Sequence, residues 1–313
     1  MKLHLGPILI SGLLASCHGF AAKRGGGGGK KKTASKKGRG GFGSSTIAST
    51  SETQTATPRS STELQEIDLG PAKTVYINVP PNALAPEQMK KEDMRKFASA
   101  TSGSGARSKL LDEYGSFRGR GDVIWPSSLH LSRLIANCPS FVTDRKVIDL
   151  GCGLGLASLA TLLGRPSSLT LSDVDESVLN LAVRSCTEML EVMTNPPVKS
   201  VDQLQLDWAN KSTWPQLEGE YDVVLASDIL YDDSAAEYVA DAIAHLLLRP
   251  HRQQDDSGAD EESISGRALI VDPANRKNRE AFVLKAARNG LLAEAAPFPG
   301  QEEEFVLINV TPA

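Results

Sequence analysis

Acidic residues are absent from the first 51 residues of the chain, although the whole sequence of 313 residues contains 38 of them. The same segment carries nine lysines and arginines, so a net charge of −4 for the whole chain leaves −13 for residues 52–313. The sequence therefore combines a basic N-terminal segment with an acidic body, and each is interpreted by itself.

Cysteine is also scarce. The four cysteines show no C-x-x-C pairing and have no histidine at ligand spacing; they are Cys17, Cys138, Cys152 and Cys186. This pattern argues against a zinc site and against a disulfide framework. Hydrophobic residues nevertheless make up 40% of the chain, which is enough for a sizeable core.

The N-terminus has the layout of a secretory signal peptide. Lys2 precedes an apolar run from Leu5 to Ala15 that is too short to span a bilayer, and small residues follow. From Phe20 to residue 51 the chain is basic and rich in Ser and Thr, which is typical of transit peptides. This order resembles the bipartite plastid leaders of algae with complex plastids. We therefore expect residues 1–19 to be a signal-peptide-like segment and the protein to reach a plastid.

Other interpretations of the basic segment stay open. Clustered lysines beside glycines also occur in nuclear-localisation signals and nucleic-acid-binding patches, and a plain linker can have the same composition. The alternative destinations are the secretory pathway, or the cytoplasm or nucleus if the leader is not cleaved.

The remaining chain divides into a linker and one domain. Residues 20–72 are basic and then Ser/Thr-rich without an apolar period, which predicts a disordered linker. Residues 73–313 are predicted to form one domain that begins with a weakly alternating strand and a short helical pattern at Pro86–Ala98. The pattern becomes regular from Val123 onward, and an acidic stretch at Gln253–Ser265 indicates a surface insertion.

Strand and helix patterns alternate through this domain. Strands are expected at 146–150, 168–173, 201–208, 221–228, 267–272 and 302–310, and helices from Pro126, at 156–163, at 176–192, from Ser234 and up to about Gly290. Such alternation predicts an α/β fold with a mostly parallel, Rossmann-like sheet. Two strands close together at the end predict a C-terminal antiparallel hairpin.

A glycine loop follows the first strand of the regular pattern. Gly151, Gly153 and Gly155 allow a tight turn that brings backbone N–H groups against a ligand. A dinucleotide-binding loop would have glycine at position 156, where this chain has Leu156. Asp149 would repel a pyrophosphate but attract a cationic amine or sulfonium, which favours S-adenosyl-L-methionine over NAD as the ligand.

The next two strands also end in acidic residues. Asp173 lies 18 residues beyond Gly155, where a carboxylate can accept hydrogen bonds from both ribose hydroxyls. Asp175 is instead expected to cap the following helix, because it directly precedes the helical period. At the end of the third strand, Asp207 can accept from the exocyclic amine of adenine while Trp208 packs on the ring.

The fourth strand delivers Ser227, Asp228 and Tyr231 to the same edge of the sheet. A carboxylate and a phenol at this spacing can hold an amine, since the acid attracts an ammonium and the phenol can accept or donate at nitrogen. A packed tyrosine and a capping aspartate remain the alternative interpretation.

The series GDVIWPSS, VIDLGCGLG, LSDVD, LDW and SDILY resembles the class I methyltransferases of the family-16 protein-lysine type. The marks of that family are a Trp-Pro segment before the glycine loop, here Trp125-Pro126, and an acid-x-x-Tyr motif, here Asp228-x-x-Tyr231. The match covers about residues 119–311. WPSS is closer to the calmodulin-lysine type and IVDPANRKNREAF to the electron-transfer-flavoprotein type, so the substrate stays open between them.

The resemblance implies a seven-stranded class I sheet and methyl transfer from S-adenosyl-L-methionine to a lysine of a protein, by in-line displacement without a metal. Asp228 would position the lysine amine and Tyr231 would orient its lone pair. The cofactor-binding residues expected from the loop, the strand ends and the family marks are Trp125, Asp149, Gly151, Gly153, Gly155, Asp173, Asp207, Trp208 and Ser227. Two alternatives stay open: a methyltransferase for small molecules or nucleic acids, and a silent cofactor-binding module.

Acidic residues near the fourth strand are expected to rim the opening and to attract a basic segment of the substrate protein. They are Glu218, Glu220, Asp222, Asp228, Asp232, Asp233, Glu237 and Asp241. Such a rim would repel the phosphates of nucleic acid, so the core is not expected to bind nucleic acid, and this interpretation stays open for the basic segment alone.

Overall fold

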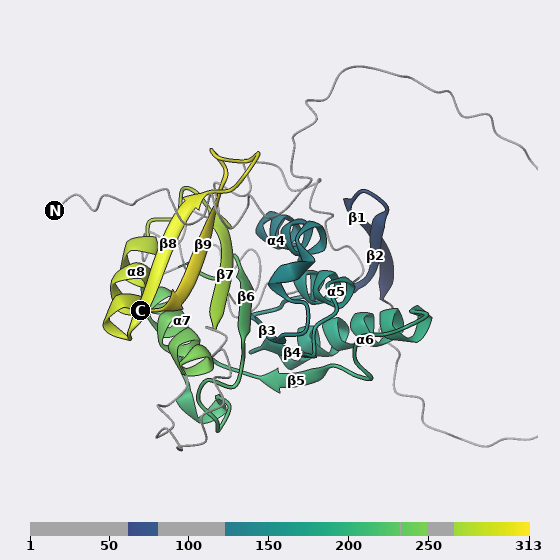
Figure 1. Cartoon of the computed structure of the whole chain (residues 1–313), viewed down its shortest axis with the longest axis horizontal. Helices are drawn as coiled ribbons and strands as arrows, with labels where there is room; N and C mark the ends of the chain where they lie inside the picture. The colour runs from purple at the N-terminus through teal and green to yellow at the C-terminus, as the bar shows by residue number, and fades with distance from the viewer. Residues whose placement is uncertain (1–61, 81–122, 232, 249–265) are drawn as a thin grey trace, which may run out of the picture. The chain divides into compact units, whose positions relative to one another are not determined.

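A seven-stranded sheet forms the centre of the fold in the computed structural model, which describes residues 62–80, 123–231, 233–248 and 266–313 (Figure 1). Its strand order is β5-β4-β3-β6-β7-β9-β8. The strands are β3 (Lys146–Leu150), β4 (Ser168–Asp173), β5 (Asp202–Gln205), β6 (Val223–Ser227), β7 (Arg267–Pro273), β8 (Leu291–Pro297) and β9 (Phe305–Pro312). Strands β3 to β7 are parallel, whereas β9 runs antiparallel to both β7 and β8. The predicted sheet with its C-terminal hairpin is confirmed.

Helices cover both faces of this sheet (Figure 1). They are α4 (Pro126–Asn137), α5 (Leu156–Leu163), α6 (Glu176–Val192), α7 (Asp233–Leu247) and α8 (Arg279–Arg288), with short 3-10 turns at Pro139–Phe141 and Lys211–Thr213. Apolar residues of α4, α5 and α6 share one buried cluster with Val147 of β3, and those of α7 and α8 share another with Ile148. Successive residues of a buried strand point to opposite faces, so each central strand contributes to both clusters.

Local sequence signals explain where several helices begin. Pro126 stands at the first helical position of α4, where its missing N–H leaves no backbone bond unmade. The Asp175 side chain accepts from Ser177 N at 2.9 Å, which confirms the predicted N-cap of α6. Among the residues that the structure describes, no helix is long and apolar enough to cross a membrane.

The linker prediction was wrong at its C-terminal end. Residues Glu63–Gly70 form strand β1, which pairs antiparallel with β2 (Lys73–Val79), so the ordered chain begins before residue 73. Only Ile67 and Leu69 supply inward-facing apolar side chains within β1, which is too short an alternation to stand out from a polar linker. The expected leader, the helix at Pro86–Ala98 and the acidic insertion lie outside the described residues.

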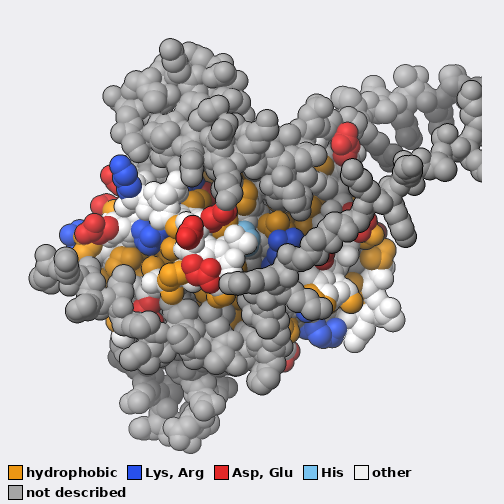
Figure 2. Space-filling view, turned by 90° about the horizontal axis from the view of Figure 1, so that it is seen from above, with side chains coloured by type: hydrophobic (Ala, Val, Ile, Leu, Met, Phe, Trp, Pro, Cys, Tyr) orange, Lys and Arg blue, Asp and Glu red, His pale blue; other side chains and the backbone are white. Residues whose placement is uncertain are grey.

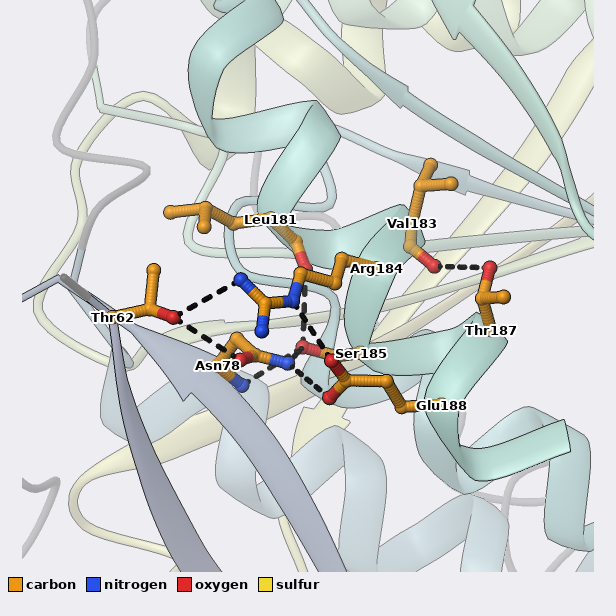
Figure 3. A network of polar contacts seen from close by, with 8 residues as sticks. All are labelled: Thr62, Asn78, Leu181, Val183, Arg184, Ser185, Thr187 and Glu188. Atoms are coloured by element: carbon orange, nitrogen blue, oxygen red, sulfur yellow. Dashed lines mark hydrogen bonds and ion pairs between the residues drawn. The ribbon is translucent and has the colours of Figure 1, made fainter. Parts of the chain in front are cut away.

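A polar network fastens the β1–β2 hairpin to α6 (Figure 3). The backbone N–H of Asn78 donates to Ser185 Oγ at 2.8 Å, and the Asn78 side chain donates to Glu188 Oε2 at 2.8 Å. Ser185 in turn donates to the carbonyl of Leu181, and Arg184 pairs with Glu188. Because Ser185 is buried, its hydroxyl replaces water for the Asn78 backbone.

Replacing Ser185 with alanine is expected to lower the free energy of unfolding by about 1–3 kcal/mol, since the buried N–H of Asn78 loses its acceptor. Thr187→Ala is the matched control, because the exposed Thr187 hydroxyl bonds only the carbonyl of Val183 in its own helix. We expect that control to stay within about 0.5 kcal/mol of the parent. Urea titration of both variants measures the difference, and equal losses would show that the hairpin does not depend on this bond.

Candidate functional site

The carboxyl ends of β3, β4, β6 and β7 meet at one edge of the sheet, which is where open α/β sheets bind ligands. The loop between β8 and β9 reaches the same edge, because Phe305 at the start of β9 pairs with Pro273 at the end of β7. Most of the residues predicted to bind cofactor or substrate follow these strand ends.

The glycine loop turns sharply between β3 and α5. Gly151, Gly153 and Gly155 have φ values of 69°, 53° and 81°, in the left-handed region that disfavours other residues. A Cβ on Gly151 would lie 2.8 Å from Cζ2 of Trp208, so the loop backbone also needs glycine to approach that ring. The loop is fixed to β4 by bonds from Cys152 N to the carbonyl of Ser172 and from Gly153 N to Asp173 Oδ2.

Asp149 lies beneath this loop. Its side chain is 3% exposed and accepts a hydrogen bond from Ser158 Oγ of α5 at 2.6 Å. Burial raises the pKa of Asp149 to about 6, against the effect of the Ser158 bond. The carboxyl group therefore ties the glycine loop to α5, and direct contact with a cationic ligand stays a prediction.

Asp173 lies between the glycine loop and the start of α6. Its Oδ2 accepts from Gly153 N and its Oδ1 from Asp175 N, both at 3.0 Å. Burial raises the pKa of Asp173. The backbone of Val174 also hydrogen-bonds this carboxylate, so three of its about four acceptor positions are used within the protein. Its contact with the two ribose hydroxyls stays a prediction.

Asp207 lies farther from its strand than predicted, because β5 ends at Gln205. Its Oδ1 accepts from Ala209 N at 2.9 Å, and its carbonyl accepts from the indole N–H of Trp214. The adjacent Trp208 ring packs beside Gly151 and lies 6.0 Å, centroid to centroid, from the ring of Tyr231. Trp208 therefore connects the glycine loop with the tyrosine of the acid-x-x-Tyr motif.

Asp228 follows β6 and adopts a left-handed backbone, with φ at 58°. Its N–H donates to the carbonyl of Val271, and its side chain, 7% exposed, forms an ion pair with Arg276. Ser127 Oγ of α4 donates to Asp228 Oδ2 at 3.3 Å. The Asp228 carboxylate is therefore held within the protein by groups from two other elements.

Trp125 brings α4 to the same place. It stands at the N-cap of α4, where its carbonyl accepts from Ser128 N at 3.0 Å and from Ser128 Oγ at 2.7 Å. The Trp125 side chain is half-buried, as is that of Ser227 at the end of β6. The Trp-Pro segment thus starts the helix whose Ser127 contacts Asp228, which connects the two sequence marks in space.

The predicted acidic rim was wrong for the three acids that precede β6. Glu218, Glu220 and Asp222 precede β6, so they lie toward the opposite edge of the sheet; Asp222, for instance, accepts from Lys146 N at the start of β3. Asp241 pairs with Lys285 of α8. These acids are close to Asp228 in the sequence. Strand β6 lies between them and Asp228, however, so they adjoin opposite ends of that strand.

Several residues at this edge were missed by the sequence interpretation. Arg276 and Asp272 contribute charges beside Asp228, and acidic residues Glu302–Glu304 occupy the β8–β9 loop. On the face shown in Figure 2, acidic side chains gather near the middle of the described surface, beside a histidine. Asp272 could have been predicted from the sequence, because it ends the apolar run of the fifth predicted strand in the same way as Asp173 ends the second.

Comparison with known proteins agrees with this arrangement. A sequence model of a family described as lysine methyltransferase matches residues 108–251. The chain is 28% identical to the human protein-lysine N-methyltransferase EEF2KMT over 245 residues, covering 73% of this chain and 71% of that protein. It is 27% identical to the zebrafish (Danio rerio) electron transfer flavoprotein beta subunit lysine methyltransferase over 115 residues, which is 37% of this chain and 40% of that protein.

A solved structure described as a TehB-like SAM-dependent methyltransferase from Corynebacterium glutamicum is 18% identical, with a TM-score of 0.43, over 69% of this chain and 99% of that one. The residues matched by the family model include the Trp-Pro segment, the glycine loop and the acid-x-x-Tyr motif, which the fold brings to one edge of the sheet. Residues 108–251 are therefore similar to the lysine methyltransferase family, and 73% of the chain is similar to a protein-lysine N-methyltransferase.

Proposed function

We propose that this protein transfers a methyl group from S-adenosyl-L-methionine to a lysine side chain of a protein substrate. The observation that carries this proposal is the position of Trp208, whose ring packs beside Gly151 of the glycine loop and lies 6.0 Å from the ring of Tyr231. The predicted cofactor site and the predicted amine site are therefore neighbours. Protein substrates of relatives such as EEF2KMT support the choice of a protein acceptor.

The residues at the strand ends suit the cofactor. The left-handed turns of the glycine loop bring its backbone beside Asp173, which accepts from Gly153 N and is proposed to accept from the ribose hydroxyls of the cofactor. When bound, the cofactor supplies an electrophilic methyl group on a sulfonium. Because this methyl needs no further activation, we propose an in-line displacement that requires no metal ion, with the protein aligning the partners and excluding water.

The acceptor lysine must first lose a proton. This costs about 1.4 kcal/mol for each pH unit below its unperturbed pKa of about 10.4. In the proposal, Asp228 positions the amine and Tyr231 orients its lone pair toward the methyl group. Burial of the amine beside the positive sulfonium lowers the pKa of the lysine, because both effects disfavour the charged form.

The substrate lysine is proposed to lie in a basic segment. Residues 52–313 carry a net charge of −13, and the acidic loop Glu302–Glu304 lies at the same edge of the sheet as Asp228. Complementary charge of this kind accelerates association with a basic partner.

Incubation of the protein with tritiated-methyl S-adenosyl-L-methionine and a lysate of the source organism tests the proposal. We expect label in protein, and mass spectrometry should place the methyl group on lysine. Label in RNA or in small molecules would favour the alternative substrate class. Failure to bind the cofactor in a calorimeter would instead favour a silent interaction module.

Replacing Tyr231 with phenylalanine is expected to lower kcat on the order of 100-fold, because the phenol that orients the amine is removed. The cofactor dissociation constant should change little, since the ring that packs near Trp208 remains. Tyr238→Phe is the matched control, as Tyr238 is exposed on α7. Steady-state kinetics measure kcat for both variants. A kcat of Tyr231→Phe equal to that of Tyr238→Phe would exclude the proposed role of Tyr231 in orienting the amine.

We further propose that residues 1–61, which precede strand β1, direct the protein to a plastid, with the signal-peptide-like segment removed first. A fusion of these residues to a fluorescent protein, expressed in an alga with complex plastids, tests this. Fluorescence in the secretory pathway, cytoplasm or nucleus would identify the alternative destination.

A further inference from the structure

Arg276 connects the loop after β7 with the acid-x-x-Tyr motif. Its Nη2 pairs with Asp228 Oδ1, and the two side chains are 11% and 7% exposed. Its Nε lies 3.9 Å from Asp272 Oδ2, and the Asp272 side chain is fully buried. One guanidinium is therefore flanked by two carboxylates inside the protein, at the edge of the sheet where the methyl acceptor is proposed to bind.

Asp272 holds the same motif at a second point. Its Oδ1 accepts from the backbone N–H of Leu230 at 3.5 Å, and Leu230 directly precedes Tyr231. Burial raises the pKa of Asp272 to about 7, and the positive charge of Arg276 opposes this rise. The segment from Asp228 to Tyr231 is thus attached to β7 and its following loop by one ion pair and one backbone bond.

The cluster of Asp228, Asp272 and Arg276 has features that do not favour the stability of the fold. Asp272 Oδ2 and Arg276 Nε make no hydrogen bond with any residue that the structure describes, although both are buried. Asp228 also keeps a left-handed backbone, which neighbouring contacts must maintain. Since well-packed apolar residues often replace buried ion pairs without loss of stability, a cluster of this kind is better explained by its effect on the site.

We propose that Arg276, flanked by Asp228 and Asp272, is a positioning residue for methyl transfer that fixes the Asp228 carboxylate and the segment carrying Tyr231. This inference rests on the proposed function, in which Asp228 and Tyr231 act on the lysine amine. Arg276 itself need not touch the substrate, because its effect passes through Asp228.

The experiment compares Arg276→Gln, Arg276→Lys and Arg279→Gln in steady-state methyl transfer and in calorimetric titration with S-adenosyl-L-methionine. Arg279→Gln is the matched control, because Arg279 donates to the carbonyls of Pro273 and Ala274 in the same loop. It therefore removes an anchor of the loop while leaving the Asp228 ion pair in place.

We expect Arg276→Gln to lower kcat about 100-fold, as a displaced catalytic group would. The cofactor dissociation constant should change by less than about threefold, since the Arg276 side chain pairs with Asp228 and lies beside Asp272, and neither residue belongs to the glycine loop. The kcat of Arg276→Lys should be about tenfold higher than that of Arg276→Gln, because an ammonium keeps the positive charge but lacks the planar geometry of the guanidinium. Arg279→Gln should lose less than about threefold in kcat.

A double variant, Asp228→Asn with Arg276→Gln, should be no slower than Asp228→Asn alone, because residues that act as one unit are not additive. If the two single losses in kcat multiply in the double variant, the inference is overturned. A normal kcat for Arg276→Gln, or a loss of kcat in the Arg279→Gln control as large as in Arg276→Gln, would also overturn it. If Arg276→Gln does not fold, Arg276→Lys decides: unchanged kcat would overturn the inference. A wild-type protein that methylates no lysine would refute the proposed function, which is a different outcome.

Discussion

Asp228→Ala is expected to abolish measurable methyl transfer and to lower the free energy of unfolding by about 3–5 kcal/mol. The large loss of stability follows from the environment of the side chain, which is 7% exposed and paired with Arg276. Truncation removes the closer of the two carboxylates beside the buried Arg276 guanidinium and leaves Ser127 Oγ without this acceptor. The loss of activity follows from the proposed role in holding the lysine amine.

Two measurements separate these effects. Urea unfolding gives the stability, and methyl transfer at a temperature where the variant is folded gives the activity, with cofactor binding followed by calorimetry. Asp241→Ala is the control, since Asp241 also forms an ion pair but with side chains 21% and 26% exposed. Asp241→Ala should lower the free energy of unfolding by about 1 kcal/mol or less and leave methyl transfer unchanged. Full activity of Asp228→Ala with normal cofactor binding would remove Asp228 from the proposed mechanism.

Gly151→Ala is expected to weaken cofactor binding on the order of 100-fold, which corresponds to about 2.7 kcal/mol. A Cβ at this position would lie 2.8 Å from Cζ2 of Trp208, so either the loop or the ring must move. The left-handed φ of 69° adds a strain of about 1–2 kcal/mol for any residue with a side chain. Both effects act on the loop proposed to face the cofactor.

Gly290→Ala separates the steric effect from the backbone strain. Gly290 has a similar φ of 79°, but a Cβ there would meet nothing within 4 Å. We expect this control to lose stability by about 1 kcal/mol and to bind the cofactor normally. Calorimetric titration of both variants gives the comparison, and equal affinities would show that contact between Gly151 and Trp208 does not shape the cofactor site.

Local patterns in the sequence predicted most of the sheet and its helices. The apolar run of β3 followed by glycines, the helical period of α6 and the cap at Asp175 each lie within a few residues of the feature that they specify. Boundaries were less accurate where the apolar pattern was weak. Strand β5 ends at Gln205 and not at Trp208, and β1 was assigned to a linker because only Ile67 and Leu69 point inward.

The candidate site was predicted to the extent that its residues follow strand ends. Asp173, Ser227 and Asp228 lie at such ends, because parallel strands bring all their carboxyl ends to one edge. Acids before β6 were wrongly included in the rim, since closeness along the chain does not show which end of a strand they adjoin. Arg276 was not selected, because nothing beside it in the sequence indicates its partner.

The sequence by itself determined the alternation of strands and helices after Val123, the glycine loop and the family marks at Trp125-Pro126 and Asp228-x-x-Tyr231, since each depends on neighbouring residues. The tertiary structure decided the contacts between distant segments. Arg276 pairs with Asp228 across 48 positions, and Asn78 bonds Ser185 across 107. Such pairs form only when the sheet and its helices bring the two segments together, so no local pattern of charge or polarity in the sequence predicts them.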